Sequence, residues 1–244
     1  MTYCIGMRLD AGLVFMSDTR TNAGVDNVST VRKLFSWSVP GERHITLMTA
    51  GNLATTQTVV SLLDERTKPV GDRDPSILSE PSMFRVARLV GETLRKAIDE
   101  AVQTGPQSEA ASFSATLILG GQIEGSRPTL FLIYPEGNFI EIGDEVPFFQ
   151  IGETKYGRPI LVRAYDPAMD FHEAVKLMLV SFDSTIKANL GVAPPLDALA
   201  VPNDAFRPAI ERRFQPDDPY LTQISRNWGD ALKKALEMLP PFED

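Results

Sequence analysis

Large apolar residues alternate with other residues at the start of the chain. Within residues 2–9, every second position falls on one side of a strand and is apolar: Tyr3, Ile5, Met7 and Leu9. The turn signal DAG at 10–12 separates this run from a second apolar run at 13–17. Two such runs joined by a glycine-containing turn predict a β-hairpin.

Further strands are predicted where short apolar runs are bounded by polar or glycine-containing segments. A polar loop with glycine and asparagine is predicted at 21–30, directly after the hairpin. Beyond this loop, the predicted strands lie at 33–38, 44–50, 113–120, 128–134, 138–142, 148–151, 197–202 and 207–214.

Elsewhere the apolar positions follow the period of a helix. Residues 82–103 carry the i, i+3, i+4, i+7 stripe of an amphipathic helix most clearly. Asn52, directly after Gly51, is a predicted N-cap for a helix over 52–66. Three further helical segments are predicted: a short one that starts within 151–161, a longer one at 170–189 and a last one at 218–238.

The order of these elements is strands, two helices, strands, two helices, strands and a helix. Helices grouped between antiparallel strands favour an α+β layered sandwich over alternating βαβ units. The longest loops, near 67–80 and 104–112, are too short to divide the chain. We therefore predict one domain over 1–244, with a C-terminal helical extension from about 215.

Composition narrows the classes of partner. The 244 residues carry a net charge of −8, with a pI of about 4.9, and include one cysteine. No basic stripe of the kind that binds nucleic acid occurs, and no apolar run approaches the roughly 18 residues of a membrane span. With no signal peptide and a single thiol, we expect a cytoplasmic protein that binds neither nucleic acid nor membrane.

Residues with metal-binding or thiol chemistry are few. His44 and His172 are the only histidines, and they lie far apart in sequence without metal-ligand spacing. Cys4 lies within a predicted strand and has no histidine beside it, which favours a small buried hydrophobe over a nucleophile. We therefore expect no metal and no cofactor.

Thr2 is the residue with the most distinctive candidate chemistry. A small residue after an initiator methionine generally permits removal of Met1, which would give Thr2 a free α-amine beside its hydroxyl. An α-amine has an ordinary pKa of about 8, so it is a base available near neutral pH. A threonine activated by its own terminal amine is an established type of nucleophile.

Such a nucleophile needs a cation that keeps the amine unprotonated, a carboxylate that holds the cation, and N–H donors for the oxyanion. Asp18 ends the second strand of the predicted hairpin and so returns to the neighbourhood of Thr2. Lys33 begins the next strand, and Gly51 ends the strand after it, where glycine lets the backbone approach a ligand closely. Singly, Asp18 is typical of a loop cap and Lys33 of a surface charge, but together at strand ends they favour a catalytic site.

Five segments carry a family resemblance: MT at 1–2, GLVFMSDTRTNAG at 12–24, RKLF at 32–35, LMTAGNLATTQ at 47–57 and IGETKYGRPIL at 151–161. They resemble the proteasome β-subunit superfamily of N-terminal nucleophile hydrolases, and the opening is similar to its bacterial branch called Anbu, or ancestral β-subunit. The resemblance covers essentially the whole chain. It implies a four-layer αββα sandwich, with two antiparallel sheets face to face between helices.

The resemblance also implies a role for each matching residue. The implied catalytic residues are Thr2, Asp18, Lys33 and Gly51, and the implied substrate-binding residues are Arg20, Thr21, Asn22 and Glu153. Thr2 matches the nucleophile, Lys33 the lysine that lowers the pKa of its amine, and Gly51 the glycine of the oxyanion hole. Thr21 and Asn22 fall where the family backbone pairs with an extended substrate, a form of strand addition.

Two departures from the family pattern affect the expected site. The family has a Gly-Ser-Gly after the later strand, and here Glu153 takes the place of its serine. Glu153 is then either a surface charge or one pole of the site. A family Asp and Ser pair should precede the strand at 197–202, but Asp183 and Ser184 are too early, and Asn189 is an alternative.

Two functional hypotheses follow. The first is a self-assembled threonine peptidase, a ring or helical homo-oligomer that cleaves peptides or unfolded protein, with an ATPase or a neighbouring enzyme as a further partner. The second is a proteasome-fold scaffold, or an amidohydrolase of small amides with little protease activity. The presence of Thr2 favours the first hypothesis, and the missing Gly-Ser-Gly favours the second.

Overall fold

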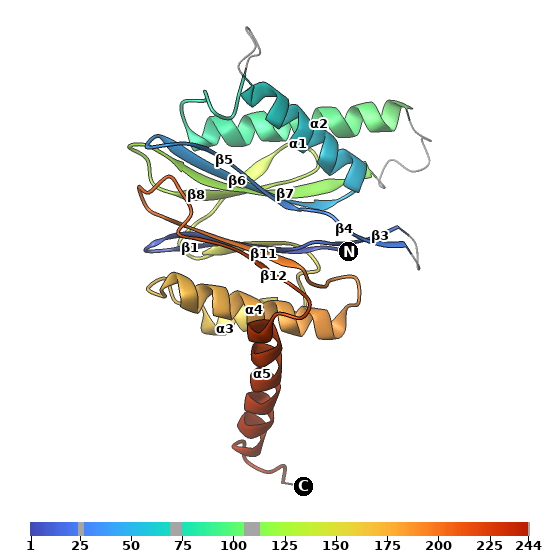
Figure 1. Cartoon of the computed structure of the whole chain (residues 1–244), viewed down its shortest axis with the longest axis vertical. Coiled ribbons are helices and arrows are strands. Elements are labelled where there is room, and N and C mark those ends of the chain that lie inside the picture. The colour runs from blue at the N-terminus through green and yellow to red at the C-terminus, as the bar shows by residue number, and fades with distance from the viewer. Residues whose placement is uncertain (24–26, 69–74, 105–112, 244) are drawn as a thin grey trace.

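The structure is a computed structural model that describes residues 1–23, 27–68, 75–104 and 113–243. Its elements form four layers, which Figure 1 shows edge-on: a pair of helices, a β-sheet, a second β-sheet and another pair of helices. The α+β sandwich expected from the order of elements is confirmed. Of the loops predicted near 67–80 and 104–112, residues 69–74 and 105–112 lie outside the described residues.

One sheet contains the start of the chain and has the strand order β10-β1-β2-β11-β12. Its strands are β1 (Tyr3–Leu9), β2 (Gly12–Asp18), β10 (Phe148–Gly152), β11 (Leu196–Pro202) and β12 (Ile210–Phe214). All of its pairs are antiparallel. The predicted hairpin is confirmed, since Cys4 lies opposite Ser17 in the β1–β2 pair.

The second sheet has the order β5-β6-β7-β8-β9, with every pair antiparallel. Its strands are β5 (Leu34–Val39), β6 (Arg43–Gly51), β7 (Ala115–Ile123), β8 (Thr129–Ile133) and β9 (Phe139–Glu141). Phe15 of the first sheet and Ile118 of the second belong to the apolar cluster between the two sheets. This cluster is the centre of the sandwich.

A two-stranded ribbon extends beyond the sheets, formed by β3 (Arg20–Ala23) and β4 (Asn27–Thr30). The loop predicted at 21–30 is therefore wrong, apart from residues 24–26, which lie outside the described residues. Both strands consist mainly of polar residues, so neither has the apolar alternation that predicts a strand from sequence. The two strands are identified from their backbone pairing with each other.

The helices cover the outer faces of the sheets. α1 (Leu53–Thr67) and α2 (Met83–Thr104) lie on the β5–β9 sheet, and α3 (Arg158–Ala164) and α4 (Phe171–Ala188) lie on the other. The predicted cap is confirmed, because the Asn52 side chain accepts a hydrogen bond from Thr55 N at 3.0 Å. The short helix predicted to start within 151–161 is confirmed: it begins at Arg158, after β10 ends at Gly152.

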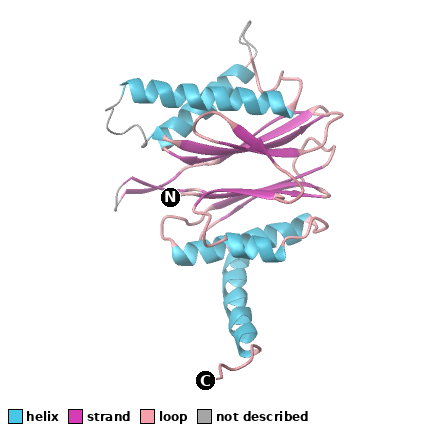
Figure 2. Cartoon of the chain, turned by 180° about the vertical axis from the view of Figure 1, so that it is seen from behind, coloured by secondary structure: helices cyan, strands magenta, loops and turns pink. Residues whose placement is uncertain are grey.

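The last helix, α5 (Pro219–Glu237), leaves the sandwich and projects as a column from the α3/α4 layer (Figures 1 and 2). Only Leu221, in its first turn, is buried. Within the described parts of the chain, no helix combines the length and apolar character needed to cross a membrane.

Both faces of β1 are buried, which fixes the start of the chain. The predicted apolar side, from Tyr3 to Leu9, packs in the cluster beneath α3 and α4. Cys4 points the other way, into the cluster between the sheets, and is fully buried. Burial also raises the pKa of its thiol, so the expected buried hydrophobe is confirmed. Thr2 is thus attached directly to a rigid strand.

Candidate active site

Asp18 connects the first strand to a buried lysine. It lies at the end of β2 and is fully buried, and its Oδ1 accepts hydrogen bonds from Tyr3 N at 3.0 Å and Lys33 Nζ at 2.8 Å. Burial raises the pKa of this carboxyl group, and the positive charge of Lys33 opposes the rise. Among the described residues, its second oxygen, Oδ2, has no hydrogen-bond partner.

The Lys33 ammonium is held beside the Met1–Thr2 peptide. Only 5% of the residue is exposed, and Nζ donates to Asp18 Oδ1, to Arg20 O at 2.6 Å and to Met1 O at 3.4 Å. An ammonium group has three N–H donors, so each of them has an oxygen acceptor here. The result is a fixed positive charge next to the peptide that precedes Thr2.

A small cavity of about 30 Å³ lies beside Thr2, and its walls include Thr21, Lys33 and Gly51. Gly51 ends β6 with a φ of +119°, which side chains other than hydrogen rarely allow. A Cβ at this position would lie 2.5 Å from the Ser114 carbonyl oxygen. Glycine is therefore required for β6 to end against β7 at this site.

Gly152 brings β10 into direct contact with Thr2. Its φ is +83°, and a Cβ there would lie 1.9 Å from the Thr2 carbonyl oxygen. The same oxygen accepts a hydrogen bond from Glu153 N at 2.7 Å. Glu153 is thereby fixed next to Thr2, with only 8% of the residue exposed. The reading of Glu153 as a surface charge is wrong.

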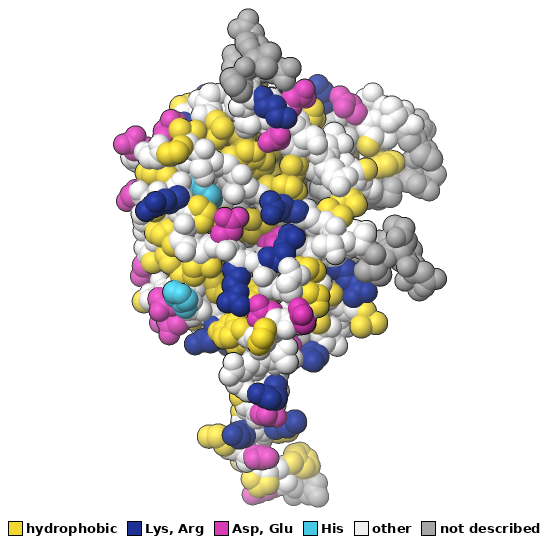
Figure 3. All heavy atoms as spheres, viewed as in Figure 1, with side chains coloured by type: hydrophobic (Ala, Val, Ile, Leu, Met, Phe, Trp, Pro, Cys, Tyr) yellow, Lys and Arg dark blue, Asp and Glu magenta, His cyan; other side chains and the backbone are white. Residues whose placement is uncertain are grey.

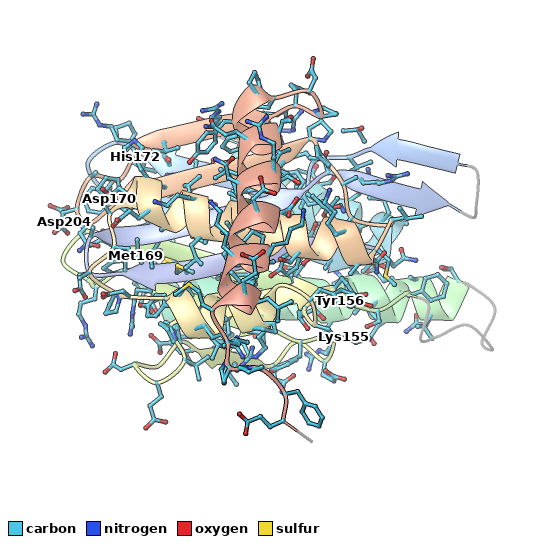
Figure 4. All side chains as sticks on the ribbon, turned by 90° about the horizontal axis from the view of Figure 1, so that it is seen from below. Lys155, Tyr156, Met169, Asp170, His172 and Asp204 are labelled. Atoms are coloured by element: carbon cyan, nitrogen blue, oxygen red, sulfur yellow. The ribbon has the colours of Figure 1, made fainter. Side chains whose placement is uncertain are left out.

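Asn189, at the C-cap of α4, completes this side of the site. Its Nδ2 donates to Glu153 Oε2 at 2.8 Å, and its Oδ1 accepts from Gly191 N at 2.8 Å. Figure 4 shows Lys155 and Tyr156, just after Glu153, at the end of the α3/α4 layer opposite to His172. The C-terminus of α4 and the end of β10 therefore meet at the end of the sandwich where the chain begins.

The predicted site residues converge in most cases. Thr2, Asp18, Lys33 and Gly51 lie together, and Thr21 of β3 lines the same cavity. Arg20 contributes its carbonyl oxygen, which binds the lysine. The backbone of Asn22 lies farther along β3, opposite Val28 of β4. Glu153 lies on the other side of Thr2.

The two histidines are separate from this site and from each other. His44 is buried in β6, where its ring nitrogens contact Ser38 Oγ at 2.7 Å and Thr46 Oγ1 at 3.0 Å. His172 is exposed in the first turn of α4. No group of three or more His, Cys, Asp or Glu residues in the described chain is arranged to hold a metal ion.

Sequence reasoning left Asn189 open and missed Gly191 altogether. A Cβ on Gly191 would lie 2.5 Å from Met1 Cβ and 3.0 Å from Asn189 Oδ1, so Met1 rests on this turn. The available signal was the NLG sequence after the α4 helix pattern, which is typical of a helix end. Nothing in that signal indicates which strand the turn contacts.

Comparison with known proteins places the chain in a family. A family model described as proteasome subunit matches residues 84–191. A mutant of Anbu from Hyphomicrobium sp. strain MC1 is 47% identical, with a TM-score of 0.90 and 100% of both chains covered. Anbu (ancestral β-subunit) from Yersinia bercovieri is 43% identical, with a TM-score of 0.92, 100% of this chain and 99% of that chain covered.

A third solved structure, described as a helical assembly of the Anbu complex from Pseudomonas aeruginosa, is 43% identical, with a TM-score of 0.91. It covers 100% of this chain and 99% of its own. A search of the curated proteins found no match.

Two face-to-face sheets between helical layers, with a threonine directly before the first strand, define a proteasome-type fold of the N-terminal nucleophile hydrolase class. Hydrolase chemistry is the general activity of that class. Within it, the chain belongs to the Anbu family, the ancestral β-subunits. The resemblance noted in the sequence is confirmed.

Proposed function

We propose that this protein is a threonine peptidase whose nucleophile, Thr2, is exposed by removal of Met1. The observation that carries this proposal is the position of the Lys33 ammonium, 3.4 Å from the carbonyl oxygen of the residue before Thr2. A fixed cation there disfavours protonation of the α-amine that removal of Met1 creates, so the amine is available as a base. Met1 is 65% exposed, which makes it accessible to an aminopeptidase.

The proposed reaction proceeds through an ester on Thr2. Thr2 Oγ bonds to the substrate carbonyl carbon while its proton passes to the α-amine, and the Gly51 N–H stabilises the oxyanion. The C–N bond then breaks, and the leaving amine takes the proton from the Thr2 ammonium. Water next attacks the ester and gives a proton to the amine. The C–O bond breaks, Thr2 Oγ regains a proton, and the carboxylic acid product leaves.

The proposed substrate is an extended peptide that pairs with β3. Among the described strands, β3 pairs on one side only, with β4, so its other edge is free to accept a further strand. Because Val31 N donates to Thr19 O, the backbone groups of Thr21 face β4, and those of Arg20 and Asn22 face the free edge. The Arg20 carbonyl already binds Lys33, so Asn22 supplies the backbone groups that a peptide can meet there. Because Thr21 also lines the cavity next to Thr2, a peptide on this edge reaches the nucleophile.

A second candidate function, hydrolysis of small amides, is favoured by the size of that cavity. A volume of about 30 Å³ favours a small group at the cleaved bond over a large one. Peptides with glycine or alanine before the cleaved bond, and small amides, are therefore the substrates that distinguish the two candidates.

The proposed working form is a homo-oligomer, a ring or a helix, in the cytoplasm. A relative with 43% identity is described as a helical assembly. The α5 column and the residues after it expose large apolar side chains: Leu232, Leu236, Met238, Leu239 and Phe242. Figure 3 shows apolar side chains at the outer end of this column. Exposed apolar surface of this extent is typical of a protein–protein interface.

Intact-mass spectrometry and a covalent probe test the proposal. We expect the mature chain to lack Met1 and to gain one adduct from a β-lactone or epoxyketone, mapped to Thr2. Thr2→Ala should abolish the adduct, whereas Thr2→Ser should keep it. Retention of Met1 on the isolated protein, or labelling that survives in Thr2→Ala, contradicts the proposal. Release of ammonia from small amides without cleavage of glycine- or alanine-containing peptides selects the second candidate.

A further inference from the structure

Glu153 is a nearly buried carboxylate without a cation. Its Oε2 accepts one hydrogen bond, from the neutral Asn189 amide, and within the described residues it forms no ion pair. Removing a carboxylate from water is costly unless a positive charge compensates it. The position of Glu153 is nonetheless tightly defined, because its backbone N–H is bonded to the Thr2 carbonyl oxygen.

Removal of Met1 changes the side of the site on which Glu153 and Asn189 lie. In the unprocessed chain, the Met1 side chain rests on the turn at Gly191, which Asn189 Oδ1 holds through the Gly191 N–H. Removal of Met1 clears this space and converts the neutral peptide nitrogen of Thr2 into an amine that can carry a proton. Processing thus creates an amine on the residue whose carbonyl oxygen is bonded to Glu153 N, at the position that Lys33 approaches through Met1 O.

Charged and polar groups from several elements lie around Thr2. β2 supplies Asp18, the segment before β5 supplies Arg32 and Lys33, the end of β10 supplies Glu153, and the C-cap of α4 supplies the neutral Asn189. Arg20, at the start of β3, binds Lys33 through its carbonyl oxygen. Asp18 and Lys33 form an ion pair at 2.8 Å and largely neutralise each other. Of the two carboxylates, Glu153 is the one that forms no ion pair within the described residues.

We infer that Glu153, oriented by Asn189, is the anionic partner of the Thr2 α-ammonium and sets the pH range in which this amine acts as a base. The inference rests on the proposed function, in which the amine of Thr2 is free. Glu153 is a positioning residue in this role, since it acts through the amine and not on the substrate. It also opposes Lys33: the lysine favours the neutral amine and the carboxylate favours its protonated form.

The negative charge of Glu153 therefore raises the pKa of the Thr2 amine. An opposite charge within about 4–6 Å typically moves a pKa by about one to three units, so loss of the Glu153 charge should lower the pKa of the Thr2 amine by about one unit or more. Activity should then extend to lower pH. Asn189→Ala, which changes no charge but releases the carboxylate, should produce a smaller shift in the same direction.

The test uses full-length protein with Thr2 as its first residue, produced by cleavage of an amino-terminal fusion. The pKa of the Thr2 amine is measured from the pH dependence of its acetylation by acetic anhydride, quantified on the amino-terminal peptide by mass spectrometry. The pH dependence of Thr2 labelling by a β-lactone is measured in parallel. Variants are Glu153→Gln, Asn189→Ala and a control, Glu92→Gln, which removes an exposed carboxylate on α2.

We expect Glu153→Gln to lower the amine pKa and to move the acidic limb of labelling by the same amount, with no change in Glu92→Gln. An amine pKa that is the same in wild type, Glu153→Gln and Asn189→Ala overturns the inference and points to Asp18 Oδ2 as the partner. Absence of labelling in wild type, with the pKa shift present, rejects the proposed peptidase but keeps the Glu153 pairing. If Glu153→Gln fails to fold, Asn189→Ala decides the result.

Discussion

Gly51 occupies a backbone conformation and a space that only glycine fits. Its φ is +119°, and a Cβ would lie 2.5 Å from the Ser114 carbonyl oxygen and 2.6 Å from Ala115 Cα. Gly41 also has a positive φ, +75°, but a Cβ there would meet nothing within 4 Å. A side chain at Gly41 would meet backbone strain alone, whereas one at Gly51 would meet the strain and a steric clash with neighbouring backbone.

We predict that Gly51→Ala destabilises the protein by about 2–5 kcal/mol, because strain of about 1–2 kcal/mol adds to about 1–3 kcal/mol of overpacking against the neighbouring backbone. Gly41→Ala should cost only about 1 kcal/mol, since it carries the strain alone. Urea unfolding of both variants measures the difference. Equal losses in the two variants would show that the collision at Gly51 relaxes.

The Asp18–Lys33 ion pair is a second feature whose energetics depend on individual residues. Both groups are buried and 2.8 Å apart, so each compensates a charge that water does not reach. Removal of one partner from such a pair typically costs about 3–5 kcal/mol, because the other charge is left alone. Replacement of both by neutral groups avoids that cost.

We therefore predict that Lys33→Met lowers the free energy of unfolding by about 3 kcal/mol and that Asp18→Asn/Lys33→Met recovers part of this loss. Thr2 labelling should be absent in both variants, since neither has the cation beside the amine. The measurement is a double-mutant cycle by urea unfolding, with Asp18→Asn as the fourth corner. Additive losses in the cycle would contradict direct coupling of the two charges.

At the scale of elements, His44 connects two strands. It pairs with Ser38 across β5 and β6, and its ring contacts Ser38 Oγ and Thr46 Oγ1. Burial lowers the pKa of His44 from its ordinary 6.5 to about 4. The unfolded chain therefore binds this proton as the pH falls through about 6.5, whereas the folded chain binds it only near pH 4.

The folded state binds the proton only at a lower pH than the unfolded state does. His44 therefore stabilises the fold above pH 6.5 and loses this contribution as the pH falls toward 4. We predict that this residue accounts for about 2 kcal/mol of the stability lost between roughly pH 7.5 and pH 5. His44→Gln should flatten the pH dependence of the melting temperature over that range. His172→Gln, at the exposed histidine, is the matched control and should leave the slope unchanged.

Elements with a strong pattern of their own were predictable from sequence. The helix at 82–103 is observed at Met83–Thr104, and the hairpin appears at its predicted place, because an amphipathic stripe and a glycine turn are local signals. The β3–β4 ribbon was not predictable, since backbone pairing between polar segments leaves no apolar period. The short helix predicted to start within 151–161 begins at Arg158, after β10 ends at Gly152.

At the scale of the whole molecule, α5 is the element whose apolar side chains a single chain leaves largely exposed. A groove of about 760 Å³ lies between its base and the α3/α4 layer, and Leu177, Ile224 and Trp228 are among its lining residues. Beyond this groove, Leu232 and Leu236 are 50% and 71% exposed. A helix with an uncovered apolar side gains stability when another surface covers it.

We predict that Leu236→Glu reduces the size of the assembly, because a charge in an apolar interface is costly to bury. Gln223→Glu adds the same charge on the opposite side of α5 and should leave the assembly intact. Mass photometry of the two variants gives the size, and far-UV circular dichroism checks that both remain folded. An unchanged assembly in Leu236→Glu would show that α5 is not part of the interface.

Apart from the β3–β4 ribbon, local pattern in the sequence was sufficient for the kinds and order of the elements, and for the return of Asp18 to the first strand. These depend on neighbouring residues: side-chain period, turn chemistry and helix caps. The meeting of Glu153 and Asn189, which are 36 positions apart, depends instead on how β10 and α4 pack around the start of β1. Such packing is a property of the assembled layers, so only the three-dimensional structure reveals that Glu153 and Asn189 lie together beside Thr2.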